Sequence, residues 1–340
     1  MSRHYNRYRQ RNITAETRED IDRKQPEALA AVLDRPLEPS REPAAKALLS
    51  VQDLRVTYDG GPHPVRAVDG VSFVVAEGES VGLVGESGCG KSSLGRTLLR
   101  LTDAASGSVM FDGEPVLDLA GPALKRFREK AQMIFQDPFG SLNPRMTVGR
   151  ALREVLAVHG KGSRAERHAK AAELFEAVGL DPAYLGRFPH EFSGGQRQRI
   201  GIARALAVEP RLLVADEPVS ALDVSVQVQI LNLLKDLQEQ RNLTYLFIAH
   251  DLAVVRYVCT RIFVMYLGRM VETAPASRLY VQPMHPYTRA LLSAVPDVDK
   301  GLRERQGGES GRVVLSGDVP SPSQEVRGCG FHTRCPFARD

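Results

Sequence analysis

The stretch Gly85-Glu86-Ser87-Gly88-Cys89-Gly90-Lys91-Ser92 decides the fold of this chain. It fits the pattern G-x-x-x-x-G-K-[ST] and lies between an apolar run at 80–84 and a helical run that extends to Leu101. A loop of this kind between a strand and a helix points successive backbone N–H groups at phosphate oxygens. Lys91 places positive charge near the β- and γ-phosphates, and the Ser92 hydroxyl can ligate Mg²⁺. The stretch therefore predicts a nucleotide site.

Length and composition limit the class of protein that surrounds this site. The chain has 340 residues, which is enough for two domains or for one large α/β domain with appendages, and its 43% hydrophobic and 25% charged residues are typical of a soluble globular protein. A net charge of +4 indicates no polyelectrolyte role on nucleic acid. The sequence has neither a membrane-spanning apolar run nor the apolar core of a secretory signal, and its four cysteines argue against a disulfide scaffold. We expect a soluble cytoplasmic protein that reaches a membrane only through partners.

The apolar pattern outside the loop predicts alternating strands and helices. Residues 54–58 and 71–75 alternate as antiparallel strands do, whereas 211–215 and 243–249 are apolar runs typical of a parallel sheet buried on both faces. Residues 224–240 form a long helical pattern between the last two strands. Strands that alternate with helices indicate an α/β domain, which a charged helical stretch at 148–178 interrupts.

Two carboxylates follow one of the apolar runs. Asp216 and Glu217 come directly after Leu212-Leu213-Val214-Ala215. A strand that delivers an aspartate to the carboxyl edge of the sheet, beside a phosphate loop, can hold Mg²⁺ there. The next carboxylate, Glu217, can polarise a water molecule towards the γ-phosphate.

A second phosphate-type helix start lies at Ser193-Gly194-Gly195-Gln196. Ser193 is a good N-cap, and a Ser-Gly-Gly start followed by a basic helix is an anion site. In isolation the pattern is equally typical of a plain turn before a helix. Any function assigned to this chain must therefore account for two phosphate-type helix starts.

Together these motifs resemble the nucleotide-binding subunit of an ATP-binding cassette (ABC) transporter, from Val51 to about Val295. Tyr58 matches the aromatic residue that stacks on adenine, Gln136 the lid glutamine and His250 the switch histidine. The signature runs from Phe192, which stands where Leu is usual, to Gln196. Asp223 ends the dimer-contact loop Ser220-Ala221-Leu222-Asp223.

The resemblance implies a role for each matching residue. The implied ATP-binding residues are Tyr58, Gly85, Glu86, Ser87, Gly88, Cys89, Gly90, Lys91, Ser92, Ser93, Ser193, Gly194, Gly195, Gln196 and Asp223. The implied Mg²⁺ ligands are Ser92, Gln136 and Asp216, and the implied catalytic residues are Glu217, His250 and Gln136. In this family two cassettes pack head to tail, so that the Ser-Gly-Gly-Gln of one subunit serves the ATP on the other subunit's phosphate loop.

The implied fold class is α/β: a P-loop NTPase (RecA-like) core with an antiparallel β subdomain, a helical insert and a C-terminal extension. We expect a flexible N-terminal extension at 1–47 and the ABC ATPase domain at 48–268, with its helical subdomain at about 141–204. The C-terminal extension, of the peptide-importer type, then covers 269–340.

Three stretches place the resemblance in one branch of the family. Residues 136–146 and 216–229 resemble peptide importers, and His285-Pro286-Tyr287-Thr288-Arg289-Ala290-Leu291-Leu292 resembles the C-terminal motif of oligopeptide/dipeptide importer ATPases. The implied partners are a second cassette (a copy or a homologue), two transmembrane permease subunits and an extracytoplasmic peptide-binding protein, with no nucleic acid. The implied location is peripheral, on the cytoplasmic face of the inner membrane.

Three alternatives stay open at this point. Nickel, glutathione and oligosaccharide importers belong to the same branch, so the imported solute is not decided by these motifs. A soluble ABC ATPase that acts on DNA or ribosomes usually carries two cassettes or long coiled-coil inserts. A P-loop kinase has no use for Ser193–Gln196 or His250.

The cysteines carry two further expectations. Some members of the branch bind a 4Fe–4S cluster through C-terminal cysteines, so Cys329 and Cys335 are candidate ligands, although two thiolates cannot complete such a cluster. The matching family segment has another cysteine beyond the point at which this sequence stops. Cys89 lies among backbone N–H groups and beside Lys91, which predicts a reactive thiolate; the alternative is a small residue that merely fits the loop, with its sulfur turned away from solvent.

Overall fold

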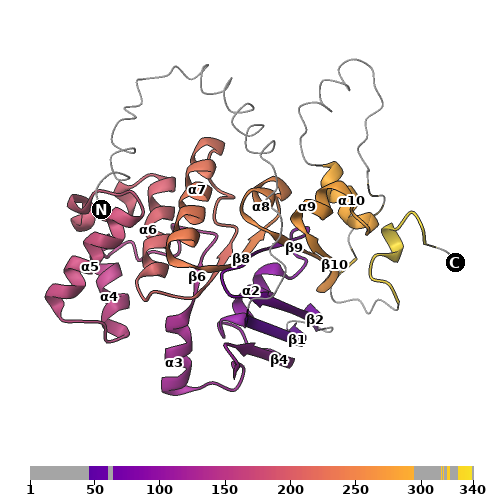
Figure 1. The fold of residues 1–340 in the computed structure, drawn as a ribbon, viewed down its shortest axis with the longest axis horizontal. Coiled ribbons are helices and arrows are strands. Elements are labelled where there is room, and N and C mark those ends of the chain that lie inside the picture. The colour runs from indigo at the N-terminus through magenta and orange to yellow at the C-terminus, as the bar shows by residue number, and fades with distance from the viewer. Residues whose placement is uncertain are drawn as a thin grey trace, which may run out of the picture.

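The fold is built around two β-sheets in a computed structural model that describes residues 46–59, 64–294, 315, 317, 320–321 and 328–338. The expected N-terminal extension at 1–47 lies, apart from its last two residues, outside the described residues. One sheet is antiparallel, with the strand order β2-β1-β4-β5, and the other has the order β10-β9-β3-β8-β7-β6. The structure is therefore an α/β fold with a separate antiparallel layer, as the sequence predicts (Figure 1).

The strands of the two sheets have the following bounds. The antiparallel sheet contains β1 (Ala47–Tyr58), β2 (Val65–Ala76), β4 (Ser106–Phe111) and β5 (Glu114–Pro115). The six-stranded sheet contains β3 (Ser80–Val84), β6 (Ala131–Ile134), β7 (Leu212–Asp216), β8 (Thr244–Ala249), β9 (Arg261–Tyr266) and β10 (Arg269–Pro275). Only the β9–β10 pair in the six-stranded sheet is antiparallel. The carboxyl ends of its five parallel strands consequently meet at one edge.

The helices have the following bounds. Those before the signature segment are α2 (Lys91–Leu98), α3 (Gly121–Lys130), α4 (Val148–Val158) and α5 (Arg164–Ala177), followed by the short 3₁₀ turns Pro182–Gly186 and Pro189–Glu191. Those after it are α6 (Gly194–Leu206), α7 (Val224–Arg241), α8 (Leu252–Val258), α9 (Ala276–Val281), α10 (Pro286–Ser293) and the 3₁₀ turn His332–Arg334.

The six-stranded sheet is buried on both faces, each against a different cluster. On β8, Leu246 and Ile248 pack into the cluster that contains α2 and the antiparallel sheet, whereas Tyr245 and Phe247 pack into the cluster of α6, α7 and α8. This alternation follows from the two-residue period of a strand. Helix α2 is thus enclosed between the two sheets.

Arg211, at the start of β7, ties the antiparallel sheet to the core. Its guanidinium contacts Glu77 at 2.6 Å and Asp112 at 2.5 Å, one residue beyond β2 and β4 respectively. The pKa of Asp112 is lowered to about 2, because Lys46 and Arg211 both donate hydrogen bonds to its carboxylate. The contacts fix the position of the layer that covers α2.

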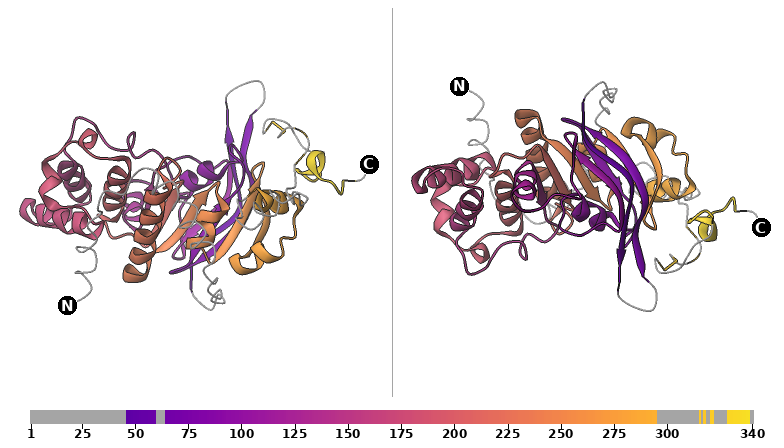
Figure 2. Two further views of the ribbon diagram at one scale, coloured as in Figure 1. Left: turned by 90° about the horizontal axis from the view of Figure 1, so that it is seen from above. Right: turned by 90° about the horizontal axis from the view of Figure 1, so that it is seen from below.

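Helices α4 and α5 lie at the opposite end of the molecule from the C-terminal extension (Figure 2). Between them, Gly160 and Gly162 have φ values of +68° and +67°, which end the helical stretch that begins at Val148. A new helix begins after Ser163, which forms a capping box with Glu166. The glycines and the capping box therefore separate α4 from α5.

The first strand of the C-terminal extension belongs to the core sheet. Strand β10 pairs with β9 across Gly268, and β9 pairs in turn with β3, the strand that leads into the phosphate loop. The extension is consequently continuous with the sheet edge at which the expected site lies.

Candidate nucleotide-binding site

The phosphate loop closes around the side chain of its own lysine. Lys91 is only 5% exposed, and its Nζ donates to the carbonyl oxygens of Gly85 at 2.8 Å and Glu86 at 2.9 Å. Gly90 has φ +105°, and a Cβ at this position would lie 1.9 Å from the carbonyl oxygen of Ala67. The ammonium is thereby held at the centre of the loop, at the start of α2, where an anion is favoured.

The structure brings Ser92 and Asp216 together beside the loop. The Ser92 hydroxyl donates to Oδ1 of Asp216 at 2.8 Å, across 124 positions of sequence. Asp216 is 1% exposed, and burial raises the pKa of its carboxyl, an effect that the Ser92 hydrogen bond opposes. A buried carboxylate beside a hydroxyl offers oxygen ligands of the kind that Mg²⁺ takes, and a cation would offset the cost of that burial.

Glu217, Gln136 and His250 form a second group at the same sheet edge. Gln136 Nε2 donates to Oε2 of Glu217 at 2.8 Å, and His250 Nδ1 lies 3.3 Å from the same oxygen. The three residues follow the carboxyl ends of β6, β7 and β8, which are neighbours in the sheet. The topology therefore assembles them although they are distant in sequence.

Glu217 has a left-handed backbone. Its φ is +45°, a conformation that costs a residue with a side chain about 1–2 kcal/mol. Its N–H donates to the carbonyl oxygen of Ile248 at 2.9 Å, and the carbonyl oxygen of Glu217 accepts the hydroxyl of Ser220 at 3.1 Å. These hydrogen bonds hold the strained turn that aims the carboxylate at Gln136 and His250.

The signature segment begins α6. Ser193 Oγ accepts the N–H of Gln196 at 3.3 Å, and Gln196 Oε1 accepts the N–H of Ser193 at 3.0 Å, which is a capping box. A Cβ at Gly195 would lie 2.4 Å from Val226, so the start of α6 packs tightly on the start of α7. In the described part of the chain, no hydrogen bond or ion pair joins residues 193–196 to the phosphate loop. The chain does not bring its two phosphate-type helix starts together.

The remaining expected residues have the following positions in the fold. Tyr58 ends β1 and is 40% exposed, while Asp223 occupies the N-cap position of α7 without a side-chain capping bond. Ser87 and Gly88 are exposed, and Ser93 is half-buried in the first turn of α2. The exposed part of the loop is thus the part a phosphate would reach.

Sequence reasoning missed two side chains that contact the loop. The N–H of Glu86 donates to the hydroxyl of Tyr287 at 2.7 Å, and Arg334 Nη1 lies 2.9 Å from Oε2 of Glu86. Tyr287 belongs to the motif at 285–292, but that motif served only to indicate a branch of the family. Nothing in its spacing indicates that it lies against a loop some 200 positions earlier.

The expected reactive thiolate at Cys89 is wrong. Cys89 is 5% exposed, and burial raises the pKa of its thiol more than Lys91, whose Nζ lies 3.8 Å from Sγ, lowers it. A Cβ at Gly85 would lie 2.8 Å from Cys89 Sγ, so the sulfur fills the space inside the loop. The side chain acts as a small packed residue.

Within the part of the chain that the structure describes, the C-terminal cysteines have no partners for a cluster site. Among the described residues there is no group of three or more His, Cys, Asp or Glu side chains that could hold a metal ion. Cys329 is exposed, Cys335 is half-buried and both are free. The described residues therefore do not fit a 4Fe–4S cluster, which needs four ligands.

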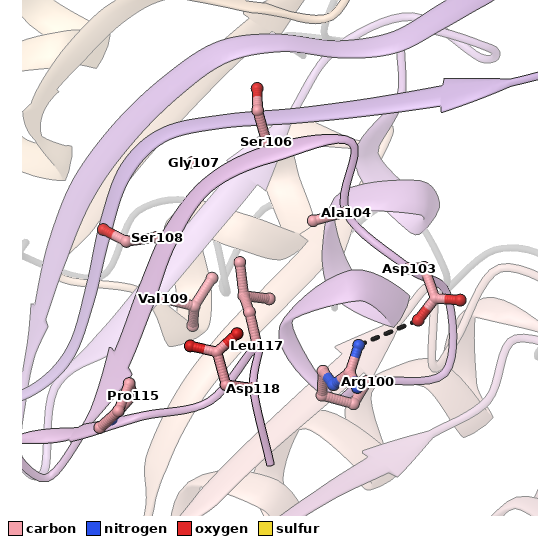
Figure 3. A pocket seen from close by; sticks show the side chains of 10 residues that line it. All are labelled: Arg100, Asp103, Ala104, Ser106, Gly107, Ser108, Val109, Pro115, Leu117 and Asp118. Carbon is pink, nitrogen blue, oxygen red and sulfur yellow. Dashed lines mark hydrogen bonds and ion pairs between the residues drawn. The ribbon is translucent and has the colours of Figure 1, made fainter. Parts of the chain in front are cut away.

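A pocket of about 370 Å³ lies apart from these motifs (Figure 3). It is lined by residues that follow α2, including Arg100 and Asp103, and by β4, and the Arg100–Asp103 ion pair of 2.9 Å crosses one side of it. It contains no residue of the phosphate loop and no residue from the carboxylate group. The chemistry of the molecule lies at the strand ends instead.

A phosphate loop, a buried aspartate at a neighbouring strand end and a Glu–Gln–His group define a nucleotide-hydrolysing P-loop protein. The ABC transporter family matches residues 68–220, and the oligopeptide/dipeptide transporter C-terminal region matches 271–340. A putative peptide import ATP-binding protein of Brucella ovis is 54% identical over 86% of this chain and 90% of its own length. The oligopeptide transport ATP-binding protein AppF of Bacillus subtilis is 53% identical over 81% of this chain and 83% of its own.

Solved structures agree with these sequence matches. A dimeric ATP-binding cassette in a post-hydrolysis state with ADP and Pi has a TM-score of 0.62 and 31% identity, and covers 67% of this chain and 98% of its own. The cassette cbiO1 of Clostridium perfringens has a TM-score of 0.62 and 27% identity, and covers 69% and 91%. The chain belongs to the ABC transporter family, and it is an ATPase.

Within the described residues, no helix has the length and apolarity needed to cross a membrane.

The first prediction concerns the cysteines. We expect a maleimide to label Cys329 in the native protein at least ~10²-fold faster than Cys89, because Cys89 is buried with a raised thiol pKa and Cys329 is exposed. Peptide mapping after timed labelling measures both rates. In denaturant the two should label at similar rates, and native labelling of Cys89 as fast as Cys329 would contradict the packed position.

Proposed function

We propose that this ATPase energises the import of oligopeptides or dipeptides through a transporter whose channel is made by other chains. The observation that carries the proposal is a nucleotide site joined, through the β9–β10 hairpin, to a C-terminal region of the oligopeptide/dipeptide transporter type. Relatives that match most of the chain are named as peptide import or oligopeptide transport ATP-binding proteins. The protein would act at the cytoplasmic face of the membrane, with two permease subunits and an extracytoplasmic binding protein.

In this proposal ATP lies on the phosphate loop with Mg²⁺. Backbone N–H groups of the loop and the Lys91 ammonium bind the phosphates, and Tyr58 lies under the adenine. Ser92 and Asp216, whose Oγ and Oδ1 atoms are 2.8 Å apart, would hold the cation together with Gln136, and a bound cation would supply positive charge beside the phosphates.

Glu217 is the group that activates water. Gln136 and His250 both engage Oε2 of Glu217, which fixes the plane of the carboxylate and leaves Oε1 to accept a proton from water. His250 is 57% exposed at its side chain, so it lies on the surface that a γ-phosphate or a second subunit reaches. These roles make the Glu–Gln–His group the catalytic centre.

The second nucleotide contact comes from another subunit. The start of α6 is capped and packed on α7, yet Ser193 and Gly194 are exposed and contact no residue of their own phosphate loop. A head-to-tail dimer would place them on the partner's ATP, and the similar cassettes that have been solved include dimers. The partner is a second copy or a homologue.

Co-purification and transport together test the solute and the partners. We expect the tagged full chain, solubilised from membranes, to retain two permease subunits and a second cassette. Reconstituted in proteoliposomes with the binding protein, the complex should raise its ATPase rate with oligopeptides or dipeptides. A rate raised only by nickel, glutathione or an oligosaccharide would reassign the solute, and recovery with DNA or ribosomes instead of membrane proteins would overturn the importer.

Replacing the catalytic carboxylate tests the hydrolysis step. We expect Glu217→Gln to retain ATP binding but to lower kcat by ~10²-fold or more, because one positioned base contributes about that much. The variant should also accumulate an ATP-dependent dimer, which gel filtration with and without Mg-ATP measures. Retained turnover would reject Glu217 as the base, and a monomer under all conditions would count against the dimer.

The shared site is tested by a substitution on the signature helix. We expect Ser193→Arg to impair hydrolysis at the partner's nucleotide more than at its own, because the bulky side chain occupies the surface that faces the partner. Mixed assemblies with one Ser193→Arg subunit, and a Lys91→Ala substitution in one or the other subunit, separate the two sites. Damage confined to the mutated subunit's own nucleotide would exclude the head-to-tail arrangement.

A further inference from the structure

The C-terminal extension holds the second residue of the phosphate loop from two directions. The hydroxyl of Tyr287, on α10, accepts the N–H of Glu86 at 2.7 Å. Arg334, in the last described turn, donates from Nη1 to Oε2 of Glu86 at 2.9 Å. Two segments that are 201 and 248 positions away in sequence therefore meet at one residue of the loop.

Glu86 also joins this contact to the phosphate-binding lysine. Its carbonyl oxygen accepts Lys91 Nζ at 2.9 Å and the N–H of Cys89 at 3.3 Å. The N–H of Glu86 also shares one planar peptide group with the carbonyl of Gly85, which accepts Lys91 Nζ at 2.8 Å. A rotation of that peptide group that releases the Tyr287 hydroxyl therefore displaces an acceptor of the Lys91 ammonium. The position of the lysine is thus coupled to the extension through the peptide group between Gly85 and Glu86.

The extension is itself rigid where it contacts the loop. Tyr266 from β9, Tyr287 and Phe331 form a buried aromatic cluster, with ring centroids 4.7 Å apart for Tyr266–Tyr287 and 5.2 Å for Tyr266–Phe331. The N–H of Tyr287 donates to His285 Nδ1 at 3.2 Å, and Glu272 on β10 accepts the N–H of His285 at 2.9 Å. The hydroxyl of Tyr287 is therefore presented at a fixed place.

We propose that Tyr287 and Arg334 are positioning residues that hold the phosphate loop, and with it Lys91, in the conformation that binds ATP. The inference rests on this loop being the ATP site. It follows that a displacement of the C-terminal extension lowers ATP affinity in the same subunit, without touching Glu217, Gln136 or His250. The extension is then part of the nucleotide site rather than an appendage to it.

The decisive variant removes one oxygen atom. We expect Tyr287→Phe to raise the Kd for Mg-ATP, and the KM, by about 5- to 10-fold, which corresponds to the loss of one buried hydrogen bond. The kcat at saturating ATP should stay within about twofold, since the catalytic group is untouched. The purified full chain serves for ATP binding, and the reconstituted transporter serves for kcat and KM.

Tyr280→Phe is the matched control. Tyr280 lies on α9 of the same extension, and its hydroxyl donates to the carbonyl oxygen of Leu252, away from the loop. Both substitutions remove a hydrogen-bonded tyrosine hydroxyl from the extension and should lower thermal stability similarly. Only Tyr287→Phe should change the Kd for ATP, so equal effects of the two variants on ATP affinity would overturn the proposal.

Arg334→Gln and amide exchange complete the test. Arg334→Gln should weaken ATP binding in the same direction, and Tyr287→Phe should speed hydrogen exchange at the Glu86 amide in the absence of nucleotide. An unchanged Kd in both variants would overturn the proposal, even if Lys91→Ala abolishes ATP binding. If instead Lys91→Ala leaves ATP affinity unchanged, the assignment of the loop itself fails, which is a different result.

Discussion

The rest of this structure depends on a buried ammonium. Lys91 can be enclosed only because two carbonyl oxygens of its own loop accept hydrogen bonds from Nζ, since an unpaired buried charge costs several kcal/mol. That arrangement forces the loop into a closed turn, and the turn requires Gly90 because Ala67 leaves no space for a side chain. The sheet that carries Ala67 must therefore lie directly against the loop. The Arg211 contacts with Glu77 and Asp112 keep it there.

The order of the strands, and not proximity in the sequence, places carboxylates near the Lys91 ammonium. Parallel strands end at one edge, so Asp216 and Glu217 from β7 arrive beside a loop that follows β3, although β8 lies between the two strands. Asp216 is costly to bury, as the raised pKa of its carboxyl shows, and Ser92 offsets only part of that cost. The site thus contains an acceptor that a divalent cation would stabilise, which would couple Mg²⁺ binding to the order of the loop.

Sequence reasoning predicted the fold well where chemistry and period agree. The phosphate loop, the strand before Asp216 and the long helix after Asp223 have strong local patterns, and the structure forms β3, β7 and α7 there. The sequence-based predictions failed where tertiary packing determines the environment of a residue. Cys89 has the neighbours of a reactive thiol, but the tight turn around Gly85 buries the sulfur and desolvation outweighs the charge of Lys91. The contacts of Tyr287 and Arg334 carry no local signal, because the β9–β10 hairpin and the packing of Tyr287 and Phe331 on Tyr266 determine where the extension lies.

Under the two proposals above, two parts of the protein affect the nucleotide site in different ways. On one side, the start of α6 packs on α7 through Gly195 and Val226, which holds the exposed Ser193–Gly194 surface against a helix that packs on the core sheet. On the other side, the extension is fixed to β9 through its aromatic cluster and reaches the loop at Glu86. In the proposed head-to-tail dimer the first would act on the ATP of a neighbouring subunit, whereas the proposed effect of the extension lies within the chain. ATP affinity would then depend both on whether a partner is docked and on whether the subunit's own extension is in place.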